Sequence, residues 1–441
     1  MTTSNTITIV IGRRLDEPTS GSSVYLMSFL NLAKQSNLRI RVVAAPVRSF
    51  GTRPWMRLHA DFIALIDNFV WDGSVRFGTI FLSTSLSLWA RLIPRFWFTV
   101  KSYLSGNAGA KPLSQLGMEL PEREKKGVQN AIRRERSDIV VTEYNSLGAV
   151  LEDIPARSKA IFLHDLFSLR AESFRASGLP PDHIDISLTD EAKRCRFADV
   201  LIHASANELH HLAEHLPRKQ HYWMSPRFPD ALIKSSTDEP ARAVFIGVRH
   251  GGNSDALAYL LDTIWPKVRA QLPTTELWVV GTVGQLVPKD IADGPLGIRV
   301  LGRIDDLAEI GGRQSIGLAP TTTASGVSIK VVEYMSLGMP ALVLPGALTG
   351  YDHLLDDYVI KAETDDAFCS ALIRLLKDEE LRKRTAARAF EDVPNLLSNH
   401  ELRRWLANDQ TTKICTADRA EERTTKHPQI EGTDHRHELQ A

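Results

Sequence analysis

Residues 316–345 read IGLAPTTTASGVSIKVVEYMSLGMPALVLP, and this stretch is the strongest indication of the fold. An apolar run opens it and ends in a polar loop that Gly326 closes. Apolar residues then recur at helical spacing from Ile329 onward, before a second apolar run at 341–344. This order predicts a strand, a loop, a helix and a second strand, a unit whose loop and helix N-terminus together form a ready anion site.

Two charged residues at the start of the helix indicate the kind of ligand. Lys330 and Glu333 lie three residues apart, so they share one face of the helix beside the loop. A basic group and a carboxylate in that place suit a ligand that carries both phosphates and sugar hydroxyls. The alternative is an ordinary ion pair between Lys330 and Glu333 on the surface of a helix.

The same stretch resembles the donor-binding segment of family 4 glycosyltransferases, which use nucleotide sugars, and in particular the branch that reads GVKIKVVE at this point. The resemblance implies that Glu333 binds the ribose hydroxyls of the donor. It also implies donor contacts from Ser325, Gly326 and Val327. The chain departs from the family at Ser325, where a second glutamate normally touches the transferred sugar.

The rest of the chain alternates between strand and helix patterns. The strand pattern TITIVI at 6–11, a helical pattern and a second strand at 39–45 predict a parallel sheet. The resemblance implies an α/β protein of GT-B fold, with two doubly wound Rossmann-like domains that face each other across a cleft. The predicted parts are an acceptor-side domain at 1–229, a linker at 230–240, a nucleotide-sugar-binding domain at 241–395, a closing helix at 396–408 and a disordered tail at 409–441.

Residues 50–120 interrupt this alternation and are rich in aromatic residues and arginines. We expect a helical insertion of the N-terminal domain. The segment LSLWARLIPRFWFTVKSYL within it fits an interfacial pair of amphipathic helices broken at Pro94. The alternative is an insertion that packs against the domain. In the resembling family the N-terminal domain holds the acceptor. The tryptophans and arginines of the insertion suit an acceptor that is a saccharide or a lipid-linked saccharide at a membrane surface.

Composition narrows the class of protein. The 441 residues suggest two to three domains, and 53 basic residues balance 53 acidic ones, so there is no electrostatic argument for a nucleic-acid partner. Three scattered cysteines favour a reducing compartment. The N-terminus does not read as a signal peptide, and the apolar stretch 77–90 is too short to span a bilayer. We expect a cytoplasmic protein, peripheral on the inner face of the membrane if the insertion binds lipid.

The charge of a leaving diphosphate needs a partner. No two aspartates stand at D-x-D spacing, so we expect no metal ion. We expect helix dipoles, loop amides and cationic side chains to neutralise the diphosphate instead. The resemblance implies an arginine and a lysine from the loop after the first strand of the C-terminal domain. Arg249 fits the arginine one position late, whereas Asn253 and Asp255 stand where the lysine is expected. We predict that Lys330 supplies the missing charge.

Two candidates lie in the N-terminal half. His164 ends the strand at 159–163, where ligands gather in open α/β sheets. It resembles by position the family histidine that contacts the donor sugar, although it could instead cap the strand and bond Asp165. The loop PTSGSS could present the backbone N–H groups of Gly21 and Ser22 to the donor, as a glycine-containing loop does in the family. A small-residue turn with a helix cap explains that loop equally well.

One motif competes with this interpretation. His211, Glu214 and His215 match the zinc-protease pattern H-x-x-E-H. Because the segment lies in an ordinary α/β repeat, we favour a partly exposed polar helix.

The resemblance implies transfer of a sugar from a nucleotide-diphosphate sugar to an acceptor hydroxyl with retention of configuration, in the assembly of cell-surface polysaccharide or glycolipid. No cofactor is expected beyond this co-substrate. Two alternatives stay open. One is a nucleotide-sugar epimerase on the same fold, and the other is a catalytically degenerate nucleotide-sugar-binding protein.

Overall fold

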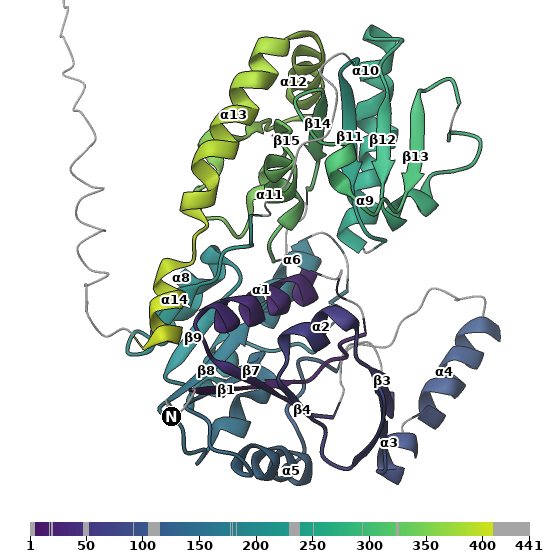
Figure 1. Ribbon diagram of the computed structural model, residues 1–441. Coiled ribbons are helices and arrows are strands. Elements are labelled where there is room, and N and C mark those ends of the chain that lie inside the picture. Colours follow the sequence, from purple (N-terminus) through teal and green to yellow (C-terminus); the bar gives the residue numbers. More distant parts are fainter. Residues whose placement is uncertain are drawn as a thin grey trace, which may run out of the picture.

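The computed structural model describes most of the chain as two α/β bodies, each built on one parallel sheet (Figure 1). The described ranges are 5–16, 18, 21–46, 53–90, 92–104, 115–176, 178, 180–181, 183–228, 239–249, 251–292, 294–322 and 326–408. Ser325, nearly all of the predicted linker at 230–240 and the predicted tail at 409–441 lie outside these ranges.

The N-terminal body is a parallel sheet of seven strands in the order β10-β9-β8-β7-β1-β2-β4. The predicted strand-helix-strand unit at the start of the chain is confirmed. Helix α1 connects β1 to β2, and these two strands pair in parallel. The strands are β1 (Thr6–Ile11), β2 (Arg39–Ala44), β4 (Asn68–Val70), β7 (Ile139–Glu143), β8 (Ser158–Leu163), β9 (Val200–His203) and β10 (Gln220–Trp223).

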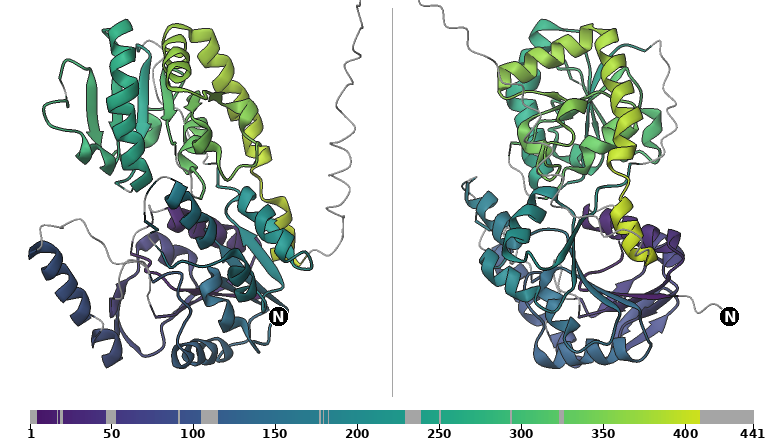
Figure 2. Two further views of the ribbon diagram at one scale, coloured as in Figure 1. Left: turned by 180° about the vertical axis from the view of Figure 1, so that it is seen from behind. Right: turned by 90° about the vertical axis from the view of Figure 1, so that its left-hand side faces the viewer.

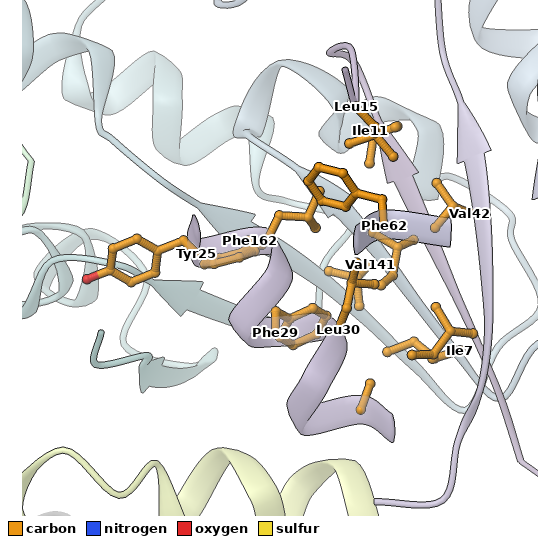
Figure 3. Close-up of a cluster of buried hydrophobic side chains, with 14 of the residues drawn as sticks. Ile7, Ile11, Leu15, Tyr25, Phe29, Leu30, Val42, Phe62, Val141 and Phe162 are labelled. Atoms are coloured by element: carbon orange, nitrogen blue, oxygen red, sulfur yellow. The ribbon is translucent and has the colours of Figure 1, made fainter. Parts of the chain in front are cut away.

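Helices cover both faces of this sheet because successive side chains of each strand point to opposite sides. Ile7 and Ile9 pack on one face with Phe29 of α1 (Gly21–Gln35), as Figure 3 shows in part. Val10 packs on the other face with Ala131 of α5 (Glu122–Arg133), where α7 (Leu188–Arg194) and α8 (Ala206–His215) also contribute. Each fully buried side chain of this size stabilises the fold by about 1.5–3 kcal/mol.

The predicted helical insertion at 50–120 is only partly helical, because its described part also contains strands. Within its described part, β4 joins the main sheet, and a small antiparallel sheet forms in the order β3-β6-β5. Gly78 supplies the positive φ of +60° that the turn between β5 and β6 requires. We did not predict this hairpin because we interpreted the segment from its aromatic and arginine content. The elements are β3 (Trp55–Arg57), α2 (Ala60–Leu65), β5 (Ser74–Phe77), β6 (Ile80–Ser83), α3 (Leu86–Ala90) and α4 (Leu92–Leu104).

The C-terminal body is a parallel sheet of six strands in the order β13-β12-β11-β14-β15-β16. Figure 2 shows both bodies from two further sides. Phe245 faces α12 (Asp365–Lys377), and Val244 faces α11 (Ile329–Ser336) and α13 (Glu379–Leu396). The doubly wound prediction is therefore confirmed. The strands are β11 (Arg242–Ile246), β12 (Leu277–Val280), β13 (Ile298–Gly302), β14 (Ser315–Ala319), β15 (Ala341–Val343) and β16 (Ile360–Lys361).

A wider helical turn precedes Pro266. Helix α9 (Gly251–Tyr259) passes through a π-helical turn at Leu260–Ile264 into α10 (Trp265–Gln271). Proline has no N–H to donate to the preceding turn, and the π turn accommodates that gap without breaking the helix.

The last described helix, α14 (His400–Ala407), packs on the N-terminal body, although α13 before it belongs to the other one (Figure 1). Leu402 and Leu406 of α14 are buried in the same cluster as the strands β1 and β2. The Oγ of Ser225 donates to the carbonyl of Leu397 at 2.7 Å, and the Oδ1 of Asn399 accepts from the N–H of Ser225 at 2.8 Å. The segment that follows β10 therefore contacts the segment that leads from α13 to α14.

Candidate functional site

Helix α11 is fixed rigidly on the sheet by one tyrosine. The hydroxyl of Tyr334 donates to the carbonyl of Leu318 at 2.9 Å and accepts from the N–H of Ile246 at 3.0 Å, so it joins α11 to β14 and β11. The ring lies directly against Gly317, where an added Cβ would come within 2.2 Å of it. Only glycine fits there, which explains the glycine within the strand.

Lys330 points from the first turn of α11 toward the start of α9 (Gly251–Tyr259), the helix that follows β11. Its Nζ donates to Oδ1 of Asn253 at 2.6 Å and lies 4.7 Å from the ring centre of Phe245. Asn253 stands where the family resemblance expects a lysine, so the structure brings the cation of α11 to that place. Burial lowers the pKa of Lys330 to about 8, and the charge of Glu333 opposes this shift.

Glu333 is half-buried, and its carboxylate makes no hydrogen bond or ion pair within the described ranges. The ion pair that we considered as an alternative is absent among these residues, since Lys330 donates to Asn253 instead. Burial raises the pKa of Glu333, and Lys330 opposes the shift. A half-buried carboxylate that has lost water without gaining a donor is suited to accept hydroxyl groups of a ligand.

Arg249 is exposed, and only its backbone N–H has a recorded bond, to Oγ1 of Thr282 at 2.9 Å. In the described part of the chain, the guanidinium of Arg249 makes no ion pair or hydrogen bond that would place it with Lys330. The predicted partnership of the two cations therefore remains a prediction.

The loop before α11 reaches the N-terminal body. Gly326 has a φ of +72°, and an added Cβ would lie 2.7 Å from Oδ1 of Asp165, the residue after His164. Val327 packs against the buried clusters of both bodies. An added Cβ at Gly21 would lie 4.0 Å from Cδ1 of Ile329. The N-termini of α1 and α11 therefore meet at the boundary between the two sheets (Figure 1).

His164 is buried, with 5% of its surface exposed, at the end of β8. Its Nε2 lies 2.9 Å from Oε1 of Glu143 on the neighbouring strand β7. The bond to Asp165 that we considered as an alternative is not formed, because the parallel pairing of β7 and β8 places Glu143 beside the imidazole. Glu143 is fully buried. Among the residues that the structure describes, Oε2 of Glu143 and Nδ1 of His164 are buried polar atoms without a hydrogen-bond partner.

Tyr144, next to Glu143, has a backbone conformation that only glycine adopts readily, with φ 61° and ψ 152°. Its ring packs against that of His164, with centroids 4.9 Å apart, and its phenol is hydrogen-bonded to the side chain of Ser22. Burial raises the pKa of Tyr144 above its ordinary value. Backbone strain of this kind is common at ligand-binding sites. Here the strained residue, Tyr144, contacts both Ser22 and His164.

Further contacts join the two bodies beside this cluster. The backbone N–H of Ala206 donates to the carbonyl of Gly350 at 2.9 Å. Oδ1 of Asn207 accepts from the N–H groups of Gly350 and Asp352, and Nε2 of His210 lies 2.9 Å from Oδ2 of Asp352. The start of α8 is thus held against the loop after β15.

The competing zinc motif takes a different arrangement. Nδ1 of His215 donates to the backbone carbonyl of His211 at 3.0 Å, which ties one imidazole to its own helix. Within the ranges given above, no group of three or more histidine, cysteine, aspartate or glutamate side chains is arranged to hold a metal ion.

Our sequence analysis missed Glu143, Tyr144 and the role of Asn253. Glu143 could have been found with the rule that selected His164, because it also ends a strand of the parallel sheet. The conformation of Tyr144 leaves no sequence signal, since it depends on packing around the residue.

Residues 240–378 match the family described as Glycosyl transferases group 1. The chain is 28% identical to phosphatidyl-myo-inositol mannosyltransferase of Mycolicibacterium smegmatis over 173 residues, which cover 38% of this chain and 44% of that protein. The match therefore spans less than half of the relative's length.

Two solved structures share the arrangement of the whole chain. TarM of S. aureus superposes with a TM-score of 0.61 at 8% identity, covering 92% of this chain and 99% of TarM. An E. coli trehalose-6-phosphate structure bound with UDP-2-fluoro glucose superposes with a TM-score of 0.54 at 12% identity, covering 91% and 98%. At these identities the likeness shows the fold.

Proposed function

Because residues 240–378 match the glycosyl transferases group 1 family and the chain has the two-domain GT-B fold, we propose that this protein transfers a sugar from a nucleotide-diphosphate sugar to an acceptor hydroxyl. One observation carries the proposal. The first turns of α11 present a cation, Lys330, and a carboxylate without a recorded partner, Glu333, at the boundary where the start of α1 meets them.

The proposed chemistry assigns a separate part of the donor to each group. Glu333 accepts the ribose hydroxyls, while Lys330 and the amides at the start of α11 stabilise the charge on the leaving diphosphate. His164 contacts the donor sugar. Transfer retains the anomeric configuration on the front face of the sugar, and the leaving phosphate accepts the proton of the acceptor. Lys330 and the helix supply the positive charge, so the proposed reaction needs no metal.

Glu333→Ala is expected to weaken nucleotide-sugar affinity at least about tenfold, because two charge-assisted hydrogen bonds of about 1.5–3 kcal/mol each are lost. Titration calorimetry with UDP and GDP sugars measures the change. Glu391→Ala, an exposed glutamate of the same domain, serves as the control and should bind as the wild type does. Unchanged affinity in Glu333→Ala would remove that residue from the site. Donor binding without turnover of any acceptor would favour the degenerate alternative.

An epimerase remains the second candidate because of one observation. Such an enzyme needs acidic and histidine residues together, and the structure places Glu143 beside His164, with Asp165 next in the chain. Incubating the donor without acceptor separates the two functions. A new epimer detected by NMR would support the epimerase, whereas acceptor-dependent release of nucleoside diphosphate supports the transferase.

We propose a lipid-linked acceptor and peripheral membrane binding from the exposed apolar face of α4. Ile93, Phe96 and Trp97 lie at helical spacing, with 60%, 66% and 65% of their surfaces exposed. Figure 1 shows α4 standing away from the seven-stranded sheet. Pro94 lies in the first turn of α4, where a helix tolerates proline. Within the described part of the chain, no helix combines the length and the apolar content that crossing a bilayer requires.

We expect the wild type to float with anionic liposomes, and replacement of Ile93, Phe96 and Trp97 by serine to abolish flotation. Exposed aromatic and aliphatic side chains drive interfacial binding through the apolar area that they bury. The matched control replaces three exposed apolar residues of the C-terminal body, Leu286, Phe390 and Leu396, by serine. Equal partitioning of the wild type and the α4 variant would instead indicate a soluble acceptor.

A further inference from the structure

Arg13 is a buried cation that the proposed mechanism does not use. It follows β1 directly at the carboxyl edge of the sheet, and 5% of its surface is exposed. Its Nη2 donates to Oγ of Ser23, and no carboxylate pairs with it in the part of the chain that the structure describes. Arg14 shows the ordinary arrangement, with Nη1 2.9 Å from Oδ2 of Asp16. The guanidinium of Arg13 has lost water without gaining a counter-charge.

The surroundings of Arg13 offer hydrogen-bond donors. Ser23 lies in the first turn of α1, a helix of 15 residues with no acidic residue in that turn, so its positive end is uncompensated locally. The pKa of the Tyr144 phenol, raised by burial, is lowered by the nearby charge of Arg13, and the phenol is hydrogen-bonded to Ser22.

The two acids that also act on Tyr144 have other partners. Glu143 lies 2.9 Å from His164, and Asp165 lies 3.7 Å from Nη1 of Arg170. Although Oε2 of Glu143 has no partner among the described residues, neither acid forms an ion pair with Arg13 there, so a bound anion would be a suitable counter-charge.

We propose that Arg13, Ser22, Ser23 and Tyr144 form a binding site for a phosphate group of a substrate. The planar guanidinium matches phosphate oxygens with two parallel hydrogen bonds, and a helix N-terminus adds backbone donors. The contact between Gly21 and Ile329 puts this site beside the start of α11. The inference rests on the proposed function, under which the phosphate is either the donor's diphosphate or a phosphate on the acceptor.

Calorimetric titration of inorganic phosphate into the wild type, Arg13→Gln and Arg14→Gln tests the site. We expect Arg13→Gln to weaken phosphate binding at least about tenfold, Arg13→Lys to weaken it less, and Arg14→Gln to stay within about twofold. We also expect Arg13→Gln to melt at or above the wild-type temperature, because the variant removes an uncompensated buried charge. Equal phosphate affinity in the wild type and Arg13→Gln, or no phosphate binding by the wild type, would overturn the proposal.

A second arm identifies the source of the phosphate. Inorganic phosphate is titrated into protein saturated with UDP or GDP. Phosphate binding that persists and still depends on Arg13 assigns the site to the acceptor. Phosphate binding that disappears, together with weaker nucleotide binding by Arg13→Gln, assigns it to the donor. Neither readout requires sugar transfer, so phosphate binding that depends on Arg13 in a protein without transferase activity would refute the proposed function and leave this site standing.

Discussion

We expect Lys330→Met to lower kcat by about 10²- to 10³-fold while the donor KM rises less. A preorganised cation at the leaving diphosphate stabilises charge that develops mainly in the transition state, and removing one such group commonly costs about that much. Methionine keeps the apolar side chain over Phe245, so packing is preserved. Lys383→Met is the control, since that lysine lies on α13 and pairs with Glu380. Steady-state kinetics with the donor varied gives both constants.

The pH profile gives an independent check on the same residue. Burial lowers the pKa of Lys330 to about 8, so the side chain is charged below that pH and loses its charge above it. The kcat/KM of the wild type should therefore fall as the pH rises through about 8, and Lys330→Arg should lack this decline. EDTA should leave activity intact. Complete loss of activity with the chelator, restored by magnesium or manganese, would contradict a metal-free reaction.

The second large effect is expected at His164, whose replacement by alanine should lower kcat/KM by about 10²-fold, or about 2.7 kcal/mol. The single variant also leaves the fully buried carboxylate of Glu143 without its partner, which costs stability by itself. The double variant Glu143→Gln/His164→Ala removes this charge. We expect it to recover the melting temperature but not the activity, as kinetics and calorimetry on both variants will show.

A different outcome at His164 would mean that the histidine is structural. In that case the double variant would recover both the melting temperature and the specific activity. The comparison of the single and double variants separates the effect on catalysis from the effect on folding. Glu143 and His164 form one pair, so the stability effects of replacing them are not additive.

The donor-binding unit could be predicted from the sequence because its signals are local. The apolar periods of β14, α11 and β15 and the glycine at 326 are properties of a short stretch, and the structure confirms the elements in that order. The hairpin of β5 and β6 was missed because we interpreted residues 50–120 by composition rather than by alternation. The turn at Gly78 would have indicated it.

The partners of the candidate residues could not be predicted in the same way. The pairing of His164 with Glu143 depends on which strands are neighbours, and Lys330 reaches Asn253 only because β11 and β14 lie side by side. The burial of Arg13 depends on α1 and on the chain after β7. Such relations arise from tertiary packing, so a single sequence carries no periodic signal for them.

The contact of Ser225 with Leu397 and Asn399 has a consequence for motion between the domains. Side-chain hydrogen bonds hold Ser225, which follows β10, against the segment that leads from α13 to α14, so we expect this contact to act as a hinge between the domains. We expect the domains to open by rotation about this contact, which would move the starts of α1 and α11 apart and open the donor site to exchange with solvent.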